Sequence, residues 1–254
     1  MSRPIVVDSF MINNELDMLE CRLTEIGDAV DYVIAVEADV DHQDHPKPYH
    51  LTENLSRFDA WKDKLIVVRA TGLPTIAENP DAWAREHAQR EHVATGLLEV
   101  GAQSDWVVMH GDLDEIPKAV VVRNLRPSGY VALAQRGHFW SLRWQYPIAW
   151  HGTVAARLGH VDSFGAMRDR RNFAPKLPDA GWHLSWLGTP EQALQKVGSF
   201  CHPEVSQRIS DGLASNSFLQ AGVHVDGVKM TRVEIDHTYP KWIRDGKHPE
   251  SWAQ

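Results

Sequence analysis

Alternating strand and helix patterns through residues 1–117 are the feature that most restricts the fold of this chain. Apolar residues recur at helical spacing after the first apolar run, and Asn13 or Asn14 can cap that helix. A second helical pattern covers residues 81–100. Short apolar runs predict buried strands at residues 4–10, 31–38, 64–70 and 106–112. This strand–helix–strand order implies a parallel sheet with helices on its faces.

The second half of the chain has a different character, because its predicted strands are rich in Trp, Tyr and Phe. We expect these strands at residues 130–135, 138–146, 153–158 and 181–187. Thr189 and Pro190 then form a good helix start, with Thr189 as the cap. Helical segments are expected to fill residues 191–220. No repeat or clear linker interrupts the pattern, so we expect one domain over residues 1–254.

Composition excludes several classes of protein. Hydrophobic residues make up 43% and charged residues 24% of the chain, which is ordinary globular usage and argues against disorder. The formal charge of -8 argues against a nucleic-acid surface, although a nucleotide can still bind where a cation supplies positive charge. Cys21 and Cys201 are too few for a disulfide framework. No run approaches about 18 apolar residues, so we expect no membrane span and a cytoplasmic location.

Three carboxylates follow the fourth predicted strand, in the segment Asp112-Leu113-Asp114-Glu115-Ile116-Pro117. Two aspartates one residue apart at a strand end can both reach one hard divalent cation. Mn²⁺ or Mg²⁺ held in this way usually completes its shell with water and substrate phosphate. The pattern predicts cleavage of a phosphate-linked donor, with the metal neutralising the departing diphosphate. The competing interpretation is a surface turn of solvated acids, and Pro117 is expected to stop further strand pairing.

Short motifs spread in order along the chain carry a resemblance to a known family. In the first half they are Asp8-Ser9-Phe10, Asn14-Glu15-Leu16-Asp17-Met18-Leu19-Glu20, Arg22-Leu23, Val36-Glu37, Lys47-Pro48 and Asp112 to Pro117. In the second half they are Gly181-Trp182-His183-Leu184-Ser185-Trp186, Thr189-Pro190-Glu191, Lys196 and Asp226-Gly227. Together they resemble glycosyltransferase family 17, whose known members include the bisecting N-acetylglucosaminyltransferase that acts on N-glycans.

That resemblance implies a GT-A fold, which is a Rossmann-type, mostly parallel sheet flanked by helices, together with a divalent metal and inversion at the sugar carbon. Residues 1–117 would form the nucleotide-sugar-binding half, and the aromatic-rich residues 118–254 the acceptor-binding half. The implied donor is a UDP-sugar, with UDP-GlcNAc as one candidate. The implied acceptor is a hydroxyl group of a glycan or glycoconjugate.

The expected donor site lies at the carboxyl edge of the sheet, where ligands of parallel sheets collect. Asp8, Glu37 and Asp112 all fall at predicted strand ends, so Asp8 and Glu37 are candidates to contact the base or ribose. Glu37 has the competing role of a partner for Lys47 or a plain surface acid. The helix before the metal strand supplies two more candidates, Arg85 and Gln89.

Glu86 and Arg90 lie on the same helix, and their spacing of four fits an ordinary surface ion pair. Lys196 is expected to contact the diphosphate or the acceptor. A histidine from the later chain often completes the metal shell in GT-A enzymes, and His183 is our first choice, with His237 as the alternative. A buried, hydrogen-bonded histidine is the competing interpretation of either one.

An inverting transfer needs a base to accept the proton of the acceptor hydroxyl. The sequence leaves five candidates open: Glu115, Asp162, Glu191, His202 and Asp211. Glu115 could instead orient the metal site, and Glu191 could simply face the dipole of its helix. Trp182 and Trp186 could stack on the acceptor sugar, although aromatic residues in strands are more often part of the core. A nucleotide-sugar hydrolase and a non-catalytic carbohydrate-binding protein are the alternative functions.

Overall fold

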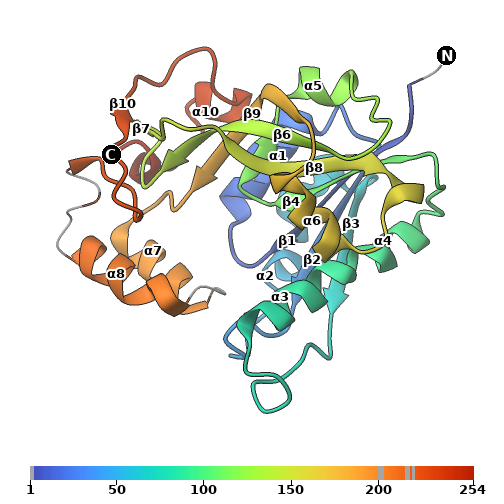
Figure 1. Ribbon diagram of the computed structural model, residues 1–254, viewed down its shortest axis with the longest axis horizontal. Helices are drawn as coiled ribbons and strands as arrows, with labels where there is room; N and C mark the ends of the chain where they lie inside the picture. Colours follow the sequence, from blue (N-terminus) through green and yellow to red (C-terminus); the bar gives the residue numbers. More distant parts are fainter. Residues whose placement is uncertain (1–2, 200–202, 215–217, 219–220) are drawn as a thin grey trace.

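The strands of this computed structural model join one mixed sheet with helices on both of its faces (Figure 1). The structure describes residues 3–199, 203–214, 218 and 221–254. Its strands are β1 (Val6–Ile12), β2 (Tyr32–Ala38), β3 (Leu65–Ala70), β4 (Val107–Asp112), β5 (Glu115–Pro117), β6 (Val131–Phe139), β7 (Trp144–Gln145), β8 (Trp150–Arg157), β9 (Lys176–Ser185) and β10 (Thr231–Arg232). Within the described ranges they follow the order β10-β7-β6-β8-β4-β1-β2-β3, and β9 pairs with β5 and β6. The predicted α/β class is confirmed.

The helices lie between these strands in the chain. They are α1 (Leu16–Ile26), α2 (His50–Glu53), α3 (Ala82–Glu91), α4 (Val93–Glu99), α5 (Ala119–Arg123), α6 (Phe164–Asp169), α7 (Pro190–Ser199), α8 (Pro203–Ala214) and α10 (Lys241–Arg244). Short 3-10 turns are η1 (Leu55–Trp61), η2 (Leu158–His160), η3 (Arg170–Asn172) and η4 (Glu250–Trp252). No helix among the described residues is long and apolar enough to cross a membrane.

Strands β3, β2, β1 and β4 run parallel, as the alternating pattern predicts. Asp112 ends β4, and Glu37 pairs with Ile12 at the end of β1, so both acids lie near the carboxyl edge. Asp8 does not, because β1 continues to Ile12 and Asp8 pairs with Met109 in the middle of the strand. The prediction that Asp8 lies at a strand end is wrong, since the apolar run extends beyond it.

The second half of the sheet is largely antiparallel, with β8 pairing β4 and β6 in that sense. The two strands predicted over residues 130–146 are instead one long strand, β6, followed by the short β7. Pro117 does not stop pairing, because β5 pairs with β9 and places Pro117 opposite Gly181. A proline is tolerated where its missing N–H is not needed by a second neighbour.

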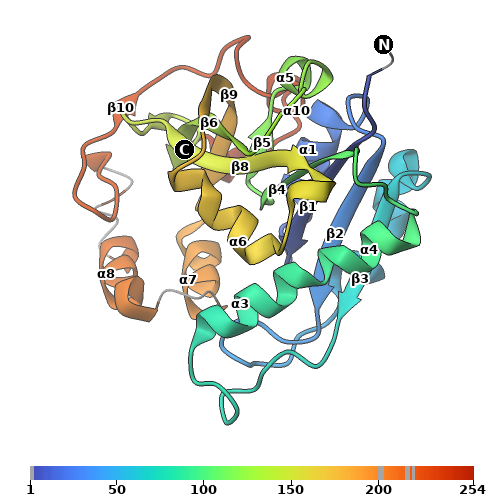
Figure 2. The same cartoon turned by 45° about the vertical axis from the view of Figure 1, so that its right-hand side comes forward.

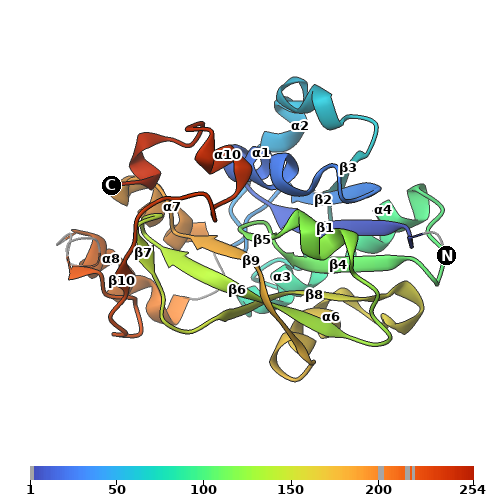
Figure 3. The same ribbon diagram turned by 90° about the horizontal axis from the view of Figure 1, so that it is seen from above.

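Two apolar layers cover the two faces of the sheet. One packs α1, α10 and η4 against the strands, and the other packs α4 and α6. Figure 3 shows α1 and α10 on one side of the strands and α6 on the other, and Figure 2 shows α3 and α4 in front of β1 and β2. The helix predicted over residues 81–100 is divided at His92, whose N–H bonds to the carbonyl of Gln89, three residues back.

Helices α7 and α8 lie beside each other (Figure 1). The predicted start of α7 is confirmed, because the Gln192 N–H donates to the Thr189 hydroxyl at 3.3 Å. Val197 of α7 and Ile209 of α8 share an apolar cluster with Phe139 and Trp140 at the end of β6. This packing brings α7 across the carboxyl edge of the sheet, where the acidic segment lies.

Candidate active site

A buried ion pair holds the acidic turn between β4 and β5. Arg22 of α1 donates to both carboxylate oxygens of Asp8 at 2.7 Å, and neither side chain has any exposed surface. The same guanidinium donates to the backbone carbonyls of Asp112 at 3.1 Å, Leu113 at 3.0 Å and Glu115 at 2.8 Å. Asp8 therefore positions Arg22, and Arg22 positions the turn. The predicted contact of Asp8 with a base or ribose is wrong, because its carboxylate is enclosed.

The carboxylate of Asp112 lies between two arginines. Its Oδ1 accepts from Arg90 of α3 and its Oδ2 from Arg168 of α6, each at 2.6 Å. Burial by itself would raise the pKa of Asp112, but the positive charges of Arg168 and Arg90 hold it well below its ordinary value. Arg90 also pairs with Glu86, so the predicted pair exists, but it is buried rather than on the surface.

Glu115 completes this network through its bonds to Arg168, to Trp150 and to the backbone of the turn. Its Oε1 accepts from Trp150 Nε1 at 2.7 Å and from Arg168 at 2.6 Å, and its Oε2 accepts from the backbone N–H of Asp112 at 3.0 Å. The side chain has no exposed surface, so an acceptor hydroxyl cannot reach it. The prediction of Glu115 as the base is wrong for that reason. Its bonds match the alternative, in which Glu115 orients the acidic turn.

Asp114, the second aspartate of the turn, faces different partners. Its Oδ1 lies 3.6 Å from His183 Nε2, and its Oδ2 lies 3.3 Å from Lys196 Nζ. His183 is on β9 directly opposite Glu115, and Lys196 is on α7. The structure thus brings His183 and Lys196 to the acidic turn. Burial lowers the pKa of His183 despite the nearby Asp114, which favours a neutral imidazole at pH 7.

The residues around the turn fit a divalent cation in part. Asp114 Oδ1 and His183 Nε2 form an oxygen–nitrogen pair of the kind that Mn²⁺ accepts, and both are shielded from bulk water. Asp112 does not fit in this arrangement, since both of its oxygens face arginines. Among the described residues, no group of three or more His, Cys, Asp or Glu side chains is arranged to hold a metal. The metal therefore stays a prediction, with Asp114 and His183 as the residues that suit it.

Aromatic rings extend from His183 along β8 and β6. Trp150 stacks on His183 with centroids 4.3 Å apart and an interplanar angle of 18°. The rings of Phe139 and His183 pack edge to face with their centroids 5.2 Å apart. Phe139 and His224 pack in the same way with centroids 4.3 Å apart. The guanidinium of Arg171 lies 5.4 Å from the ring centroid of Trp150. These rings form an aromatic wall, made of Phe139, Trp150, His183 and His224; the sequence pointed to His183 and Trp150 but not to Phe139 or His224.

The two tryptophans predicted to stack on an acceptor lie elsewhere. Trp182 points to the opposite side of β9 from His183, since neighbouring residues of a strand alternate, and packs in the core with α1. Its ring is buried on the side of β9 that faces away from the acidic turn, so this structure does not place Trp182 to stack on a sugar there. Trp186 follows β9 and contacts Trp140, with Lys196 Nζ 5.7 Å from its ring centroid. Trp186 is therefore beside the site, and its acceptor role stays a prediction.

Three side chains that were predicted to contact the donor bind backbone groups of the protein instead. Glu37 accepts from the N–H groups of Leu51 at 2.6 Å and Thr52 at 3.1 Å, which are in the first turn of α2. Arg85 donates to the carbonyl of His42 at 2.7 Å, and Gln89 donates to that of Val36 at 3.1 Å. All three side chains are buried in these bonds, so the structure does not place Glu37, Arg85 or Gln89 to contact a nucleotide.

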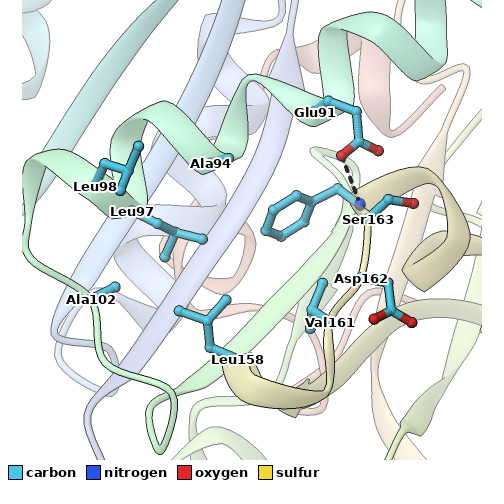
Figure 4. A pocket seen from close by; sticks show the side chains of 10 residues that line it. Glu91, Ala94, Leu97, Leu98, Ala102, Leu158, Val161, Asp162 and Ser163 are labelled. Carbon is cyan, nitrogen blue, oxygen red and sulfur yellow. Dashed lines mark hydrogen bonds between the residues drawn. The ribbon is translucent and has the colours of Figure 1, made fainter.

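The remaining candidates lie away from the acidic turn. Asp162 is exposed beside an apolar pocket of about 300 Å³ between α4 and α6 (Figure 4), whose lining includes none of the acids of the turn. Asp211 is exposed on α8 and accepts from Gln207, so it and Asp162 are not placed as bases by this fold. Glu191 and His237 are also exposed. His202 lies outside the described residues.

Arg168 is a residue of the site that the sequence patterns missed. Arg168 binds both Asp112 and Glu115 although more than fifty residues separate them in the chain. A signal was present, because Arg168, Arg170 and Arg171 form a basic cluster within four residues. Such a cluster before a strand is ordinarily a solvated surface, so its charge alone did not indicate a site.

The fold and this edge define an α/β protein with an acidic turn at the topological position where such sheets bind ligands. The model of one family, Glycosyltransferase family 17, matches residues 1–221. The chain therefore belongs to glycosyltransferase family 17, and the resemblance found in its motifs is confirmed.

Curated relatives agree with that membership. The chain is 25% identical over 232 residues to the Homo sapiens protein named beta-1,4-mannosyl-glycoprotein 4-beta-N-acetylglucosaminyltransferase, and the match covers 76% of this chain and 43% of that protein. The Rattus norvegicus protein of the same name is also 25% identical, with 42% of it covered. The chain thus spans less than half the length of these relatives. A solved structure of 4-diphosphocytidyl-2C-methyl-D-erythritol synthase has a TM-score of 0.41 and 13% identity, covering 70% of this chain and 90% of that one.

Proposed function

We propose that this protein transfers a sugar from a nucleotide-diphosphate donor to a hydroxyl group of a glycan or glycoconjugate. The observation that carries the proposal is the convergence of His183 and Lys196 on Asp114, in a turn that Arg22 and Glu115 hold at the carboxyl edge of the sheet. Family membership and the names of the curated relatives support a sugar transfer. A UDP-sugar, with UDP-GlcNAc tested first, is the donor that we propose.

We propose Mn²⁺ or Mg²⁺ as the cofactor, with Asp114 and His183 as its protein ligands. When bound, the cation would supply positive charge to the departing diphosphate. The chain contributes a neutral imidazole, because burial lowers the pKa of His183, and a fixed ammonium, because Asp114 and Glu15 raise the pKa of Lys196 against the effect of burial. Lys196 would then orient the donor beside Asp114.

For the proton acceptor we propose the pair of His224 and Asp226 in place of Glu115. His224 Nδ1 lies 2.9 Å from Asp226 Oδ1, and the Tyr146 hydroxyl donates to Asp226 Oδ2 at 2.6 Å. A carboxylate that holds one imidazole nitrogen leaves the other free to accept a proton. The ring of His224 belongs to the aromatic wall that also carries His183, which supports a position facing the acceptor.

A donor and acceptor panel tests the function. The purified protein would be incubated with UDP-GlcNAc, UDP-glucose or UDP-galactose, with Mn²⁺ or with a chelator, and with or without a β-mannosyl glycan. We expect UDP release and a heavier glycan only when metal and acceptor are both present. Equal UDP release without acceptor would instead indicate a hydrolase. Glycan binding with no donor consumption would indicate a carbohydrate-binding protein.

A further inference from the structure

Arg171 is a cation at the edge of the active-site network whose guanidinium has no hydrogen-bonded side-chain partner in the described part of the chain. It belongs to η3, directly after the helix that supplies Arg168. Its guanidinium lies 5.4 Å from the ring centroid of Trp150, and Trp150 in turn donates to Glu115. The side chain is half-buried, so it faces both the network and the solvent.

The other cations of the site have carboxylate partners. Arg90 and Arg168 share Asp112, and each binds a further glutamate. Lys196 lies near Asp114. Arg171, by contrast, has no hydrogen bond or ion pair with any side chain in the described part of the chain; its contact is the Trp150 ring. Burial and the positive charge of Arg168 lower the pKa of Arg171, whereas Glu115 and Asp112 raise it, and the guanidinium stays charged at neutral pH.

We propose that Arg171 binds the diphosphate group of the nucleotide-sugar donor. A guanidinium presents paired N–H groups that match phosphate oxygens, and stacking on an indole ring holds its plane in a defined orientation. Arg90 and Arg168 already use their N–H groups on Glu86, Asp112 and Glu115, whereas the guanidinium of Arg171 has no such partner in the described part of the chain. This inference rests on the proposed function for the identity of the anion, but the presence of an anion site can be tested separately.

The experiment compares Arg171→Gln with Arg170→Gln. Arg170 is the matched control, because it lies next to Arg171 in η3 and its guanidinium is 5.4 Å from the Tyr130 ring centroid, on a different aromatic residue. Calorimetry would measure UDP, UMP and inorganic pyrophosphate binding to the wild type and both variants. We expect Arg171→Gln to weaken UDP binding at least about tenfold and to remove much of the preference for UDP over UMP, as expected for loss of a charge-assisted phosphate contact. Arg170→Gln should bind as the wild type does.

Further results separate this inference from the proposed function. Thermal unfolding of both variants confirms that each is folded, and Arg171→Lys, which keeps the charge but loses the paired donors, should give an intermediate loss. Equal affinities in the Arg171→Gln and Arg170→Gln variants would overturn the role of Arg171. A wild type that binds pyrophosphate through Arg171 but not UDP would overturn the proposed donor and keep the anion site. A wild type that binds neither would overturn the anion site.

Discussion

The two aspartates of the acidic turn lie two positions apart in the chain but have opposite surroundings. On the Asp112 side, each carboxylate oxygen accepts a hydrogen bond at 2.6 Å from an arginine, and Glu115 fixes the backbone below. On the Asp114 side the contacts are longer, 3.3 Å to Lys196 and 3.6 Å to His183. The first side is a short-range ion network around an Asp112 side chain that is 37% exposed, whereas the second is a looser group of acid, imidazole and ammonium around an Asp114 side chain that is 13% exposed.

This difference separates structure from chemistry within one motif. Removing one member of a short-range ion network leaves the charges of its partners uncompensated, which destabilises the fold where those partners are buried, as Arg90, Arg168 and Glu115 are. Groups at longer range still have donor and acceptor capacity for a ligand. We therefore expect changes on the Asp112 side to act first on stability, and changes on the Asp114 side to act first on binding and turnover.

The largest effect should come from Arg22, which supports the Asp112 side from beneath. Arg22→Met leaves the Asp8 carboxylate buried without its partner and removes the donors to three carbonyls of the turn. We expect a loss of about 3–5 kcal/mol in the free energy of unfolding, measured by urea denaturation. The double variant Asp8→Asn, Arg22→Met should lose less than the sum of the single changes. An Arg22→Met protein as stable as the wild type would contradict the view that the Asp112 side of the turn acts first on stability.

Next in size is the contrast between Asp114→Asn and Asp112→Asn. Asp114→Asn should reduce metal-dependent turnover about a hundredfold, roughly 3 kcal/mol, with little change in melting temperature, since it breaks no short bond. Asp112→Asn should lower the melting temperature clearly, because it removes the charge shared by Arg90 and Arg168. Both quantities would be measured on both variants. Equal melting temperatures for the two would show that the sides do not differ as proposed.

A smaller effect is expected in the acid dependence of stability. The arginines hold the pKa of folded Asp112 well below the ordinary value of 3.8. The charged carboxylate therefore contributes fully to the free energy of unfolding above pH 3.8, and this contribution is lost as the pH falls through the folded pKa. Asp112→Asn should lack this part of the decline in unfolding free energy, measured from about pH 6 to about pH 2. Asp63→Asn, at an exposed position, is the control and should follow the wild type. Parallel curves for Asp112→Asn and the wild type would contradict the assignment.

The sequence predicts the parallel half of the fold well because its information is local. Apolar runs and helical spacing define β1 to β4 without reference to distant residues, and the acidic turn follows directly from the end of β4. The partners of that turn are not local. Arg168 reaches Glu115 from a helix that is placed by packing on the sheet, and no spacing rule connects the two positions.

Burial explains why several site predictions failed. Asp8, Glu37 and Arg85 are charged residues near the expected crevice, and a charge there suggests a ligand contact. In the structure each is enclosed and bonded to protein groups, because a buried charge is stable only when it is paired. Sequence shows the charge but not its partner. His183 and Lys196 do lie beside Asp114, and it was their motifs, not their charges, that pointed to this turn.

The smallest effect concerns Glu37, which lies outside both sides of the turn. Its carboxylate accepts from the N–H groups of Leu51 and Thr52 and from the Thr52 hydroxyl at 3.0 Å, so it caps α2. Glu37→Gln should lower the free energy of unfolding by about 1 kcal/mol, as for loss of a helix cap, and leave UDP affinity unchanged. Thr52→Val removes one of the three bonds and should cost less. Weaker UDP binding by Glu37→Gln at unchanged stability would return Glu37 to the donor site and widen that site beyond the acidic turn.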